Sequence, residues 1–319
     1  MIIGIDLGGM SIKGGLVNAS GLITEKKSLP TGAWREPDDI INDIAKVINH
    51  LKIQADKEDE VVSVVGLGVP GVVSHNNAFL EKCANINLEQ INLKEKIEKL
   101  CKIEVFVDND ANVAAIAEYE VGSLKDYNSG ILLTLGTGVG GGIIIDGNVI
   151  RGAHGAGAEV GHMVVGENFY DCNCGRNGCL ETFSSATGIN KYVNKILREL
   201  NDPSVLRGYD RIDTKIIFDS AKKGDVLALK AVNRFVKYLA IGIVNFINIL
   251  DPEAIALGGG VSHAGQYLVD LLKKELYKSL YSKDITIADL KLAELQNDAG
   301  IIGASFMAKK LHNSLKKND

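Results

Sequence analysis

A short pattern that occurs twice limits the fold of this chain more than any other feature of its sequence. Residues 4–17 read GIDLGGMSIKGGLV, and residues 133–145 read LTLGTGVGGGIII. Each copy has an apolar stretch, a glycine-rich turn and a second apolar stretch, which is the pattern of two strands joined by a turn. The similarity is weak, but it predicts two related βββαβα units that face each other across a cleft.

The rest of the chain alternates between strand and helix patterns. Its 319 residues, 46% of them hydrophobic, suffice for about two domains with ample cores. Short apolar runs and apolar residues at helical spacing give the expected elements. We expect strands at residues 1–7, 11–18, 22–29, 61–69, 104–108, 130–135, 140–145, 253–257 and 285–290. We expect helices at residues 37–53, 93–101, 111–122, 185–200, 215–222, 226–250 and 301–311.

Charge and cysteine content exclude some partners and locations. The net charge is −5, and the 35 basic and 40 acidic residues are interspersed, which argues against a nucleic-acid partner. The most apolar window, residues 238–250, is too short to cross a bilayer, so we expect a buried helix and no membrane partner. Asp6 and Gly8 interrupt the first apolar run, so no signal peptide is expected there. Five cysteines, three of them clustered, suit a reducing cytoplasm.

The clustered cysteines predict a metal site. Residues 152–181 read GAHGAGAEVGHMVVGENFYDCNCGRNGCLE, with Cys172, Cys174 and Cys179 inside eight residues and His162 ten residues before the first of them. Three thiolates and one imidazole suit a closed, four-coordinate zinc site of the structural kind. Two other interpretations are local disulfides, which three cysteines cannot complete, and buried free thiols. Polar neighbours such as Asn173 argue against buried thiols.

Glycine-rich turns follow four of the apolar strands, at Gly8, Pro70-Gly71, Gly136 and Gly258. Together they predict backbone N–H groups that converge on phosphate. None of the turns matches GxxxxGK[ST], so this is not a P-loop enzyme, and the turn at Gly136 leads into a strand where a dinucleotide fingerprint needs a helix. Asp6, at the end of the first strand, is a candidate to hold Mg²⁺ through water, or else a solvated acid of the turn.

A polar motif, Asp-Asn-Asp-Ala-Asn at residues 108–112, stands where a strand runs into a helix. One of these side chains is expected to cap the helix. A single cap does not require four polar residues, so a carboxylate here is also a candidate general base for attack of a hydroxyl on phosphate.

These motifs together resemble the ROK family of sugar kinases and sugar-responsive repressors, and the resemblance covers nearly the whole chain. It rests on C-x-C-G-x-x-G-C-x-E, GAHGAGAEVGH, DNDAN and LGTGVGGG. Within the family, the chain most resembles bacterial members that phosphorylate glucose. The resemblance implies an α/β fold of the actin-like, ribonuclease H-like ATPase type with two lobes around a cleft. We expect a small lobe at residues 1–120, joined by a C-terminal helix at 301–319, and a large lobe at 121–300 with the zinc loop.

The resemblance also implies an activity and its residues. The expected activity is ATP-dependent phosphorylation of a hexose, with ATP, Mg²⁺ and a structural Zn²⁺ as cofactors and Asp110 as catalytic base. The sugar would be bound by Asn85, Asn109, Asp110, Glu159, His162 and Glu181. The nucleotide site would contain Asp6, Gly8, Gly9, Lys13, Gly136, Thr137, Gly138, Gly258, Gly259 and Gly260. His162 would bind zinc, with Cys172, Cys174 and Cys179, through one nitrogen and face the sugar with the other.

Glucose is the expected sugar, with N-acetylmannosamine or fructose as alternatives and a non-catalytic sugar sensor as an alternative of another class. The family also implies a homodimer or homotetramer. The chain departs from the family pattern in three ways: Met10 replaces a threonine of the first phosphate turn, Leu88 and Glu89 stand where a tryptophan is usual, and Ala158 replaces a glycine. We therefore expect the backbone N–H groups of Gly8, Gly9 and Met10 to contact phosphate in place of the missing hydroxyl.

Overall fold

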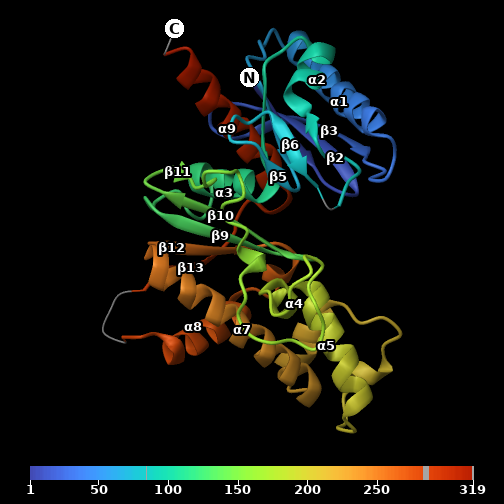
Figure 1. The fold of residues 1–319 in the computed structure, drawn as a ribbon, viewed down its shortest axis with the longest axis vertical. Coiled ribbons are helices and arrows are strands. Elements are labelled where there is room, and N and C mark those ends of the chain that lie inside the picture. Colours follow the sequence, from blue (N-terminus) through green and yellow to red (C-terminus); the bar gives the residue numbers. More distant parts are fainter. Residues whose placement is uncertain (84, 283–286, 318–319) are drawn as a thin grey trace. The chain divides into compact units, whose positions relative to one another are not determined.

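The computed structural model of this chain describes residues 1–83, 85–282 and 287–317, which fold into two compact units (Figure 1). The first unit consists of three separate stretches of the chain, namely Met1–Asn128, Gly142–Ala158 and the stretch that begins at Glu294. The second unit consists of Ser129–Gly141 and Glu159–Ala293. The last helix of the chain therefore belongs to the same unit as its first strands.

A five-stranded sheet forms the centre of the first unit. Its strands are β1 (Ile2–Leu7), β2 (Ser11–Val17), β3 (Ile23–Pro30), β4 (Val65–Val69) and β8 (Val105–Asn109). Their order is β3-β2-β1-β4-β8, with β1, β4 and β8 parallel and β2 antiparallel to both of its neighbours. A smaller antiparallel sheet contains β5 (Val72–Val73), β6 (Phe79–Lys82) and β7 (Ile91–Asn92).

Helices cover both faces of this five-stranded sheet. They are α1 (Pro37–Lys57), α2 (Leu93–Cys101), α3 (Asp110–Val121) and α9 (Ala299–Leu315). Apolar residues of α1 and α2 pack in one core with Ile3, Ile5 and Leu7, which alternate along β1. Residues of α3 and α9 pack in another core with Ile2 and Phe106. Because successive residues of a strand point to opposite faces, the central strands are buried from both sides.

Helix α9 approaches the strands and α3 so closely that three positions leave no room for a side chain. A Cβ atom at Gly4 would lie 1.9 Å from the carbonyl oxygen of Ile301, and one at Gly66 would lie 1.8 Å from that of Ala304. A Cβ atom at Gly303 of α9 would lie 1.6 Å from a carbonyl oxygen of α3. Glycine at these positions lets backbone pack on backbone, so any larger residue would force α9 away.

The chain enters α9 through a buried network centred on Glu118 of α3. The Glu118 side chain is fully buried, and its carboxylate accepts hydrogen bonds from the backbone N–H groups of Ser123 at 2.8 Å, Glu294 at 3.0 Å and Leu295 at 2.9 Å. A buried carboxylate is tolerated only when it is paired or hydrogen-bonded. Here the segment just before α9 supplies two of the donors, so Glu118 fixes the place where the chain returns to the first unit.

The second unit combines parallel strands with a group of helices. The strands β9 (Gly130–Leu135), β10 (Val139–Ile145), β11 (Asn148–Val149), β12 (Ala254–Gly258) and β13 (Asp289–Leu292) form a sheet of order β11-β10-β9-β12-β13, in which residues 142–145 and β11 belong to the first unit. β12 is parallel to both β9 and β13. The helices are α4 (Glu181–Ser184), α5 (Ala186–Glu199), α6 (Thr214–Lys222), α7 (Val226–Leu250) and α8 (Gln266–Ser279). Helices α7 and α8 lie on the same side of β12 and β13 (Figure 1).

Most of the expected elements are confirmed, and the longest helix, α7, has the expected bounds. The strand expected at residues 61–69 is wrong in its first half: β4 begins at Val65, and Val61 is 78% exposed, so an apolar residue alone did not indicate pairing. The helix expected at 37–53 continues to Lys57. The strand expected at 285–290 begins in residues outside those described, and the observed strand β13 starts at Asp289.

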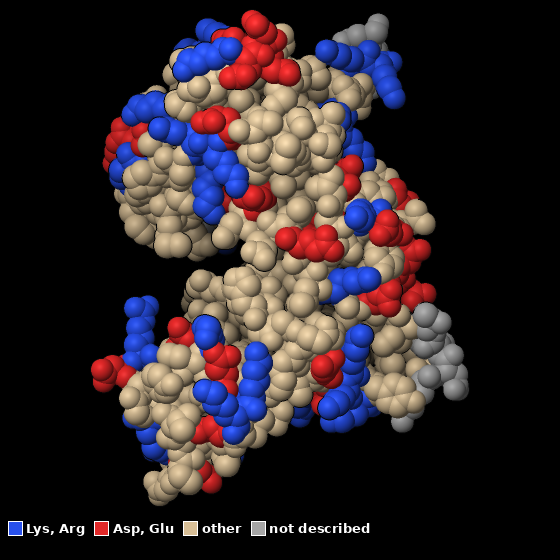
Figure 2. Space-filling model, turned by 180° about the vertical axis from the view of Figure 1, so that it is seen from behind, with Lys and Arg blue, Asp and Glu red and all other residues tan. Residues whose placement is uncertain are grey.

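Charged residues of both signs are mixed on the surface of each unit in the view drawn in Figure 2. The net charge of −5 is therefore not gathered into one patch on that face. In the described part of the chain, no helix combines the length and the apolar character needed to cross a membrane.

Candidate active site

Three parallel strands of the first unit end at one edge of the sheet, and candidate site residues follow each of them. Asp6 of β1 lies opposite Gly68 of β4, and Gly68 lies opposite Asp108 of β8. The glycine turn after β1, the turn at Pro70-Gly71 and the start of α3 are thus brought together. The carboxyl ends of parallel strands are where ligands bind in α/β folds.

The two carboxylates of the motif at 108–112 have different surroundings. Asp108 is 2% exposed and forms an ion pair with Arg151, whose Nε lies 2.7 Å from Asp108 Oδ2. The other oxygen of Asp108 accepts hydrogen bonds from Asn109 N–H at 2.8 Å and from Asn112 Nδ2 at 3.1 Å. These contacts hold Asp108 as part of the scaffold. Asp110 is only half-buried, and its Oδ1 accepts a hydrogen bond from Ala111 N–H at 2.8 Å.

Asn109 caps helix α3, as expected for one residue of this motif. Its Oδ1 accepts hydrogen bonds from the N–H groups of Ala111 and Asn112, and its Nδ2 donates to the carbonyl oxygen of Gly71 at 3.0 Å. The cap leaves Asp110 as the first residue of the helix, where the aligned peptide dipoles favour a negative charge. The same side chain ties the turn after β4 to the start of α3.

Asp6 is a largely buried carboxyl group on β1. Burial raises the pKa of Asp6, and the nearby Lys13 ammonium, 3.7 Å from Asp6 Oδ2, opposes that rise. A Cβ atom at Gly300 would lie 2.7 Å from the Asp6 carboxyl carbon, so glycine at the start of α9 makes space for the carboxyl group. Asp6 and Lys13 therefore form an ion pair beside the first glycine turn.

The first glycine turn, residues 8–11, exposes the side chain of Met10, which is 90% accessible to solvent. The expectation that three backbone N–H groups of this turn face phosphate is wrong for Gly8. Its N–H donates to the carbonyl oxygen of Ser11 at 3.0 Å and so closes the hairpin between β1 and β2. The N–H groups of Gly9 and Met10 stay as candidates.

Asn85 lies in the loop between β6 and β7, and its backbone approaches the first glycine turn. A Cβ atom at Gly9 would lie 3.7 Å from the Asn85 carbonyl oxygen. Leu88 of this loop, which takes a position where the resembling family usually has tryptophan, is fully buried in the core beside α1 and α2. Leu88 thus anchors the loop that carries Asn85.

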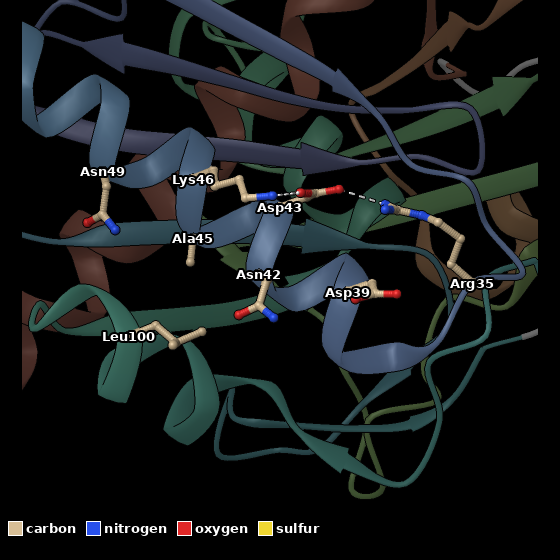
Figure 3. A pocket seen from close by; sticks show the side chains of 8 residues that line it. All are labelled: Arg35, Asp39, Asn42, Asp43, Ala45, Lys46, Asn49 and Leu100. Carbon is tan, nitrogen blue, oxygen red and sulfur yellow. Dashed lines mark hydrogen bonds and ion pairs between the residues drawn. The ribbon is translucent and has the colours of Figure 1, made fainter.

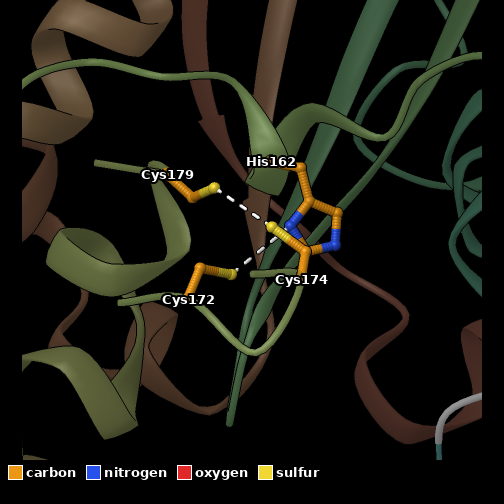
Figure 4. Close-up of side chains that lie close together, drawn as sticks. All are labelled: His162, Cys172, Cys174 and Cys179. Carbon is orange, nitrogen blue, oxygen red and sulfur yellow. Dashed lines mark hydrogen bonds between the residues drawn. The ribbon is translucent and has the colours of Figure 1, made fainter. Parts of the chain in front are cut away.

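The second unit brings His162, Cys172, Cys174 and Cys179 together, as the sequence predicts (Figure 4). Their ligand atoms all lie within 4.8 Å of one another. The Sγ atoms of Cys174 and Cys179 are 3.6 Å apart, and Cys172 Sγ is 3.6 Å from His162 Nδ1. In a tetrahedron with metal–sulfur bonds of about 2.3 Å, ligand atoms are separated by about 3.8 Å. The donor set and its spacing therefore fit a zinc ion.

Backbone turns that need glycine shape this cluster. Gly175 and Gly178 both have φ of +86°, the left-handed region that L side chains avoid. At Gly178 a Cβ atom would also lie 1.8 Å from the carbonyl oxygen of Gly166. His162 ends a short 3-10 helix, Val160–His162, which directs its ring toward the thiols.

The three thiols cannot all ionise readily without a cation. A hydrogen bond from the Arg176 backbone N–H lowers the pKa of Cys174 to about 6. Burial raises the pKa of Cys179 to about 12, and burial also raises that of Cys172. A bound dication would reverse this balance, because thiolates are its ligands.

Glu181 connects the cysteine cluster to the glycine turn after β9. Its Oε2 accepts a hydrogen bond from Val139 N–H at 3.1 Å, and its Oε1 lies 3.8 Å from Cys172 Sγ. A Cβ atom at Gly138 would lie only 2.1 Å from Glu181 Oε2. Residues expected to bind nucleotide and residues expected to bind sugar are thus in direct contact here.

The turns that follow β9 and β12 are neighbours in the second unit. Gly259 has φ of +79°, and a Cβ atom there would lie within 2.6–2.8 Å of backbone atoms of Leu135. The turns at Gly136 and at Gly258–Gly260 therefore meet at one edge of the sheet, as the turns of the first unit do.

Glu159 is exposed and follows Ala158, which has φ of +65°. A positive φ favours glycine, so alanine here accepts backbone strain of about 1 kcal/mol.

Arg151, the partner of Asp108, was missed by sequence reasoning, because nothing local indicates a contact 43 residues away.

A family model described as the ROK family matches residues 2–311, and the chain belongs to this family. The glucokinase of Halalkalibacterium halodurans is 36% identical over 99% of this chain and 97% of its own length. A crystal structure of a ROK family glucokinase from Streptomyces griseus, in complex with glucose and AMPPNP, superimposes with a TM-score of 0.81 at 31% identity, covering 97% of this chain and 99% of that one.

A ROK family transcriptional regulator, described as a homolog of the E. coli MLC protein, superimposes with a TM-score of 0.87 at 26% identity. The match covers 98% of this chain and 79% of the regulator. These likenesses confirm the expected α/β fold of the actin-like ATPase type.

Proposed function

We propose that this protein is an ATP-dependent hexose kinase and that its substrate is glucose, which it converts to glucose 6-phosphate. The observation that carries the proposal is the different setting of the two carboxylates at 108 and 110. Arg151 holds Asp108 in an ion pair, whereas Asp110 is half-buried at the start of α3. One carboxylate thus builds the site, and this difference supports Asp110 as the group that accepts a proton. The chain's likeness to a glucokinase over 99% of its length supports the same activity.

In the proposed reaction, Asp110 accepts the proton of the 6-hydroxyl as that oxygen attacks the γ-phosphorus of ATP, and the bond from this phosphorus to the bridging oxygen breaks to release ADP. The sugar is bound by Asn85, Asn109, Glu159, His162 and Glu181. The glycine turns at Gly8–Gly9, Gly136–Gly138 and Gly258–Gly260, with Lys13, bind the nucleotide. Asp6 is the candidate to hold Mg²⁺ through water, and the ion would screen the phosphate charges. Catalysis in such reactions comes mostly from positioning and electrostatic stabilisation.

The proposal includes a structural zinc ion held by His162, Cys172, Cys174 and Cys179. The ion would fix the loop that carries Glu159, His162 and Glu181 and would take no part in the chemistry. Because Glu181 is hydrogen-bonded to Val139 N–H, an ordered loop also supports the turn at Gly136–Gly138.

A non-catalytic sugar sensor is the alternative from another class, and the likeness to a transcriptional regulator favours it. N-acetylmannosamine and fructose are the alternatives within the kinase class. A coupled assay of ADP release with glucose, N-acetylmannosamine, fructose and mannose separates these functions. A kinase turns over at least one sugar well above its background ATP hydrolysis, and preference for glucose is expected. Glucose binding in calorimetry with no turnover on any sugar would identify a sensor.

Replacing Gly138 with alanine is expected to raise the KM for glucose by about tenfold or more, since a lost hydrogen bond to a charged group is worth about 1.5–3 kcal/mol. The new Cβ atom would occupy the place of Glu181 Oε2 and displace that carboxylate. The measurement is KM for glucose at saturating ATP. Gly208→Ala is the matched control, because a Cβ atom there meets no atom within 4 Å. An unchanged KM in Gly138→Ala would contradict a sugar-binding role for Glu181.

A further inference from the structure

Thr31 is a fully buried threonine just beyond β3, and it makes two hydrogen bonds to the first glycine turn. Its hydroxyl donates to the carbonyl oxygen of Gly8 at 2.6 Å, and its backbone N–H donates to the carbonyl oxygen of Met10 at 3.1 Å. A single residue thus holds the carbonyl groups of Gly8 and Met10, which stand on either side of Gly9 in this turn.

These two bonds set the direction of the donors in the turn. In a planar trans peptide, the C=O and the N–H of the same unit point in opposite directions. When Thr31 holds the Gly8 carbonyl, the N–H of Gly9 must point away from Thr31. The bond to the Met10 carbonyl directs the N–H of Ser11 away in the same manner. The two carbonyl groups therefore fix the orientation of the turn, and the N–H groups of Gly9 and Ser11 lie on the side that faces away from Thr31.

The carbonyl group of Thr31 accepts hydrogen bonds from the side chain of Arg35. The Nε and Nη2 atoms of Arg35 lie 3.1 Å and 2.7 Å from the Thr31 carbonyl oxygen, and Nη2 also donates to Asp43 Oδ2 at 2.8 Å. Lys46 binds the other oxygen of Asp43 at 2.8 Å, as Figure 3 shows. Hydrogen bonding from Lys46 and Arg35 lowers the pKa of Asp43, although partial burial opposes it.

The connection between Thr31 and Arg35 requires a left-handed backbone conformation at the residue after Thr31. Gly32 has φ of +56°, and a Cβ atom there would lie 2.6 Å from Arg35 Nε. Arg35 and Asp43 also line a groove of about 380 Å³ along α1. Because Asp43 belongs to α1, the bonds of Arg35 connect Thr31 to that helix.

We propose that Thr31 is a positioning residue for nucleotide binding, which orients the turn at Gly8–Ser11 so that the N–H group of Gly9 faces phosphate. This inference rests on the proposed kinase function, since it takes ATP as the ligand of the turn. It explains how a turn with Met10 in place of threonine stays ordered: the hydroxyl that fixes the turn comes from the end of β3. Thr31 acts through the turn and does not touch the nucleotide.

The test compares two variants that change opposite parts of Thr31. Thr31→Val keeps the shape and loses the hydroxyl, whereas Thr31→Ser keeps the hydroxyl and loses the methyl group. Thr24→Val is the matched control, because Thr24 is exposed on β3 and its hydroxyl makes only a 3.5 Å contact with Leu16 O. The measurements are the Kd of Mg²⁺-AMPPNP by calorimetry, KM for ATP and for glucose, and the melting temperature.

Thr31→Val is expected to weaken AMPPNP binding and raise the KM for ATP by about tenfold, the effect of losing one ordered hydrogen bond. The KM for glucose should change less than about twofold, and Thr31→Ser should restore most of the AMPPNP affinity. A lower melting temperature with an unchanged Kd for AMPPNP in Thr31→Val would overturn the inference, because it indicates a purely structural role. An equal loss of AMPPNP affinity in Thr31→Ser would also overturn it.

The proposed function can fail separately. If the wild-type protein binds AMPPNP but phosphorylates no sugar, the kinase proposal fails, and the comparison of Kd values still decides the role of Thr31. If the wild-type protein does not bind AMPPNP at all, the turn is not a nucleotide site and the inference is wrong.

Discussion

Asp110→Asn is expected to lower kcat for glucose phosphorylation by at least about 100-fold, because general base catalysis typically contributes about 10²–10⁴-fold. Asparagine keeps the size of the side chain, and its carbonyl oxygen can still accept the hydrogen bond from Ala111 N–H. What it cannot do is take the proton of the attacking hydroxyl. The KM for glucose should therefore change much less than kcat. A steady-state coupled assay at saturating ATP measures both constants.

Two other variants serve as controls for the effect of Asp110→Asn. Glu120→Gln removes an exposed carboxylate from the same helix and should leave kcat unchanged. Asp108→Asn should lower the melting temperature, because Arg151 would lose its ion-pair partner while staying partly buried. If Asp110→Asn turns over glucose at a near-normal rate, Asp110 is not the base.

Cys179→Ser is expected to have the second large effect, a loss of most bound metal. The wild-type protein should contain about one zinc per chain, bound by four protein ligands. Removing one thiolate from a closed site leaves an incomplete ligand set, and the loop that carries Glu159, His162 and Glu181 loses its anchor. The KM for glucose should therefore rise together with the loss of metal. Elemental analysis of purified protein, with kinetics on the same preparation, tests this expectation.

Cys101→Ala is the matched control, because Cys101 is a free thiol buried in the first unit. It should lower stability through lost packing but leave the zinc content unchanged. Full activity in wild-type protein from which all metal has been removed would refute a structural zinc ion.

The cysteine cluster could be predicted from the sequence because its ligands are near neighbours along the chain. Cys172, Cys174 and Cys179 fall within eight residues, and the glycines between them permit the sharp turns that bring the sulfur atoms together. The strands and helices were also largely predictable, since each is marked by local periodicity. Local patterns sufficed where local contacts decide the structure.

The residue pattern alone could not assign the roles of the two carboxylates in the motif at 108–112, and only the family resemblance pointed to Asp110 as the base. Asp108 and Asp110 are equivalent in the sequence, and the pairing of Asp108 with Arg151 separates them. Thr31 gave no signal either, because its importance lies in two carbonyl groups on another strand's turn. Likewise, the reason for glycine at position 138 is the carboxylate of Glu181, 43 residues further along the chain.

The place of α9 in the first unit has a consequence for how this protein is made. The ribosome synthesises β1, β4 and α3 long before α9, so the sheet face that contains Gly4 and Gly66 stays without its cover until the last part of the chain emerges. During that time Ile2, Phe106 and Val113 lack the helix that buries them. The second unit consists of residues from the interior of the sequence and can fold earlier. The first unit to be translated is therefore the last to be completed, and a nascent chain halted before α9 would expose an apolar surface of the kind that chaperones recognise.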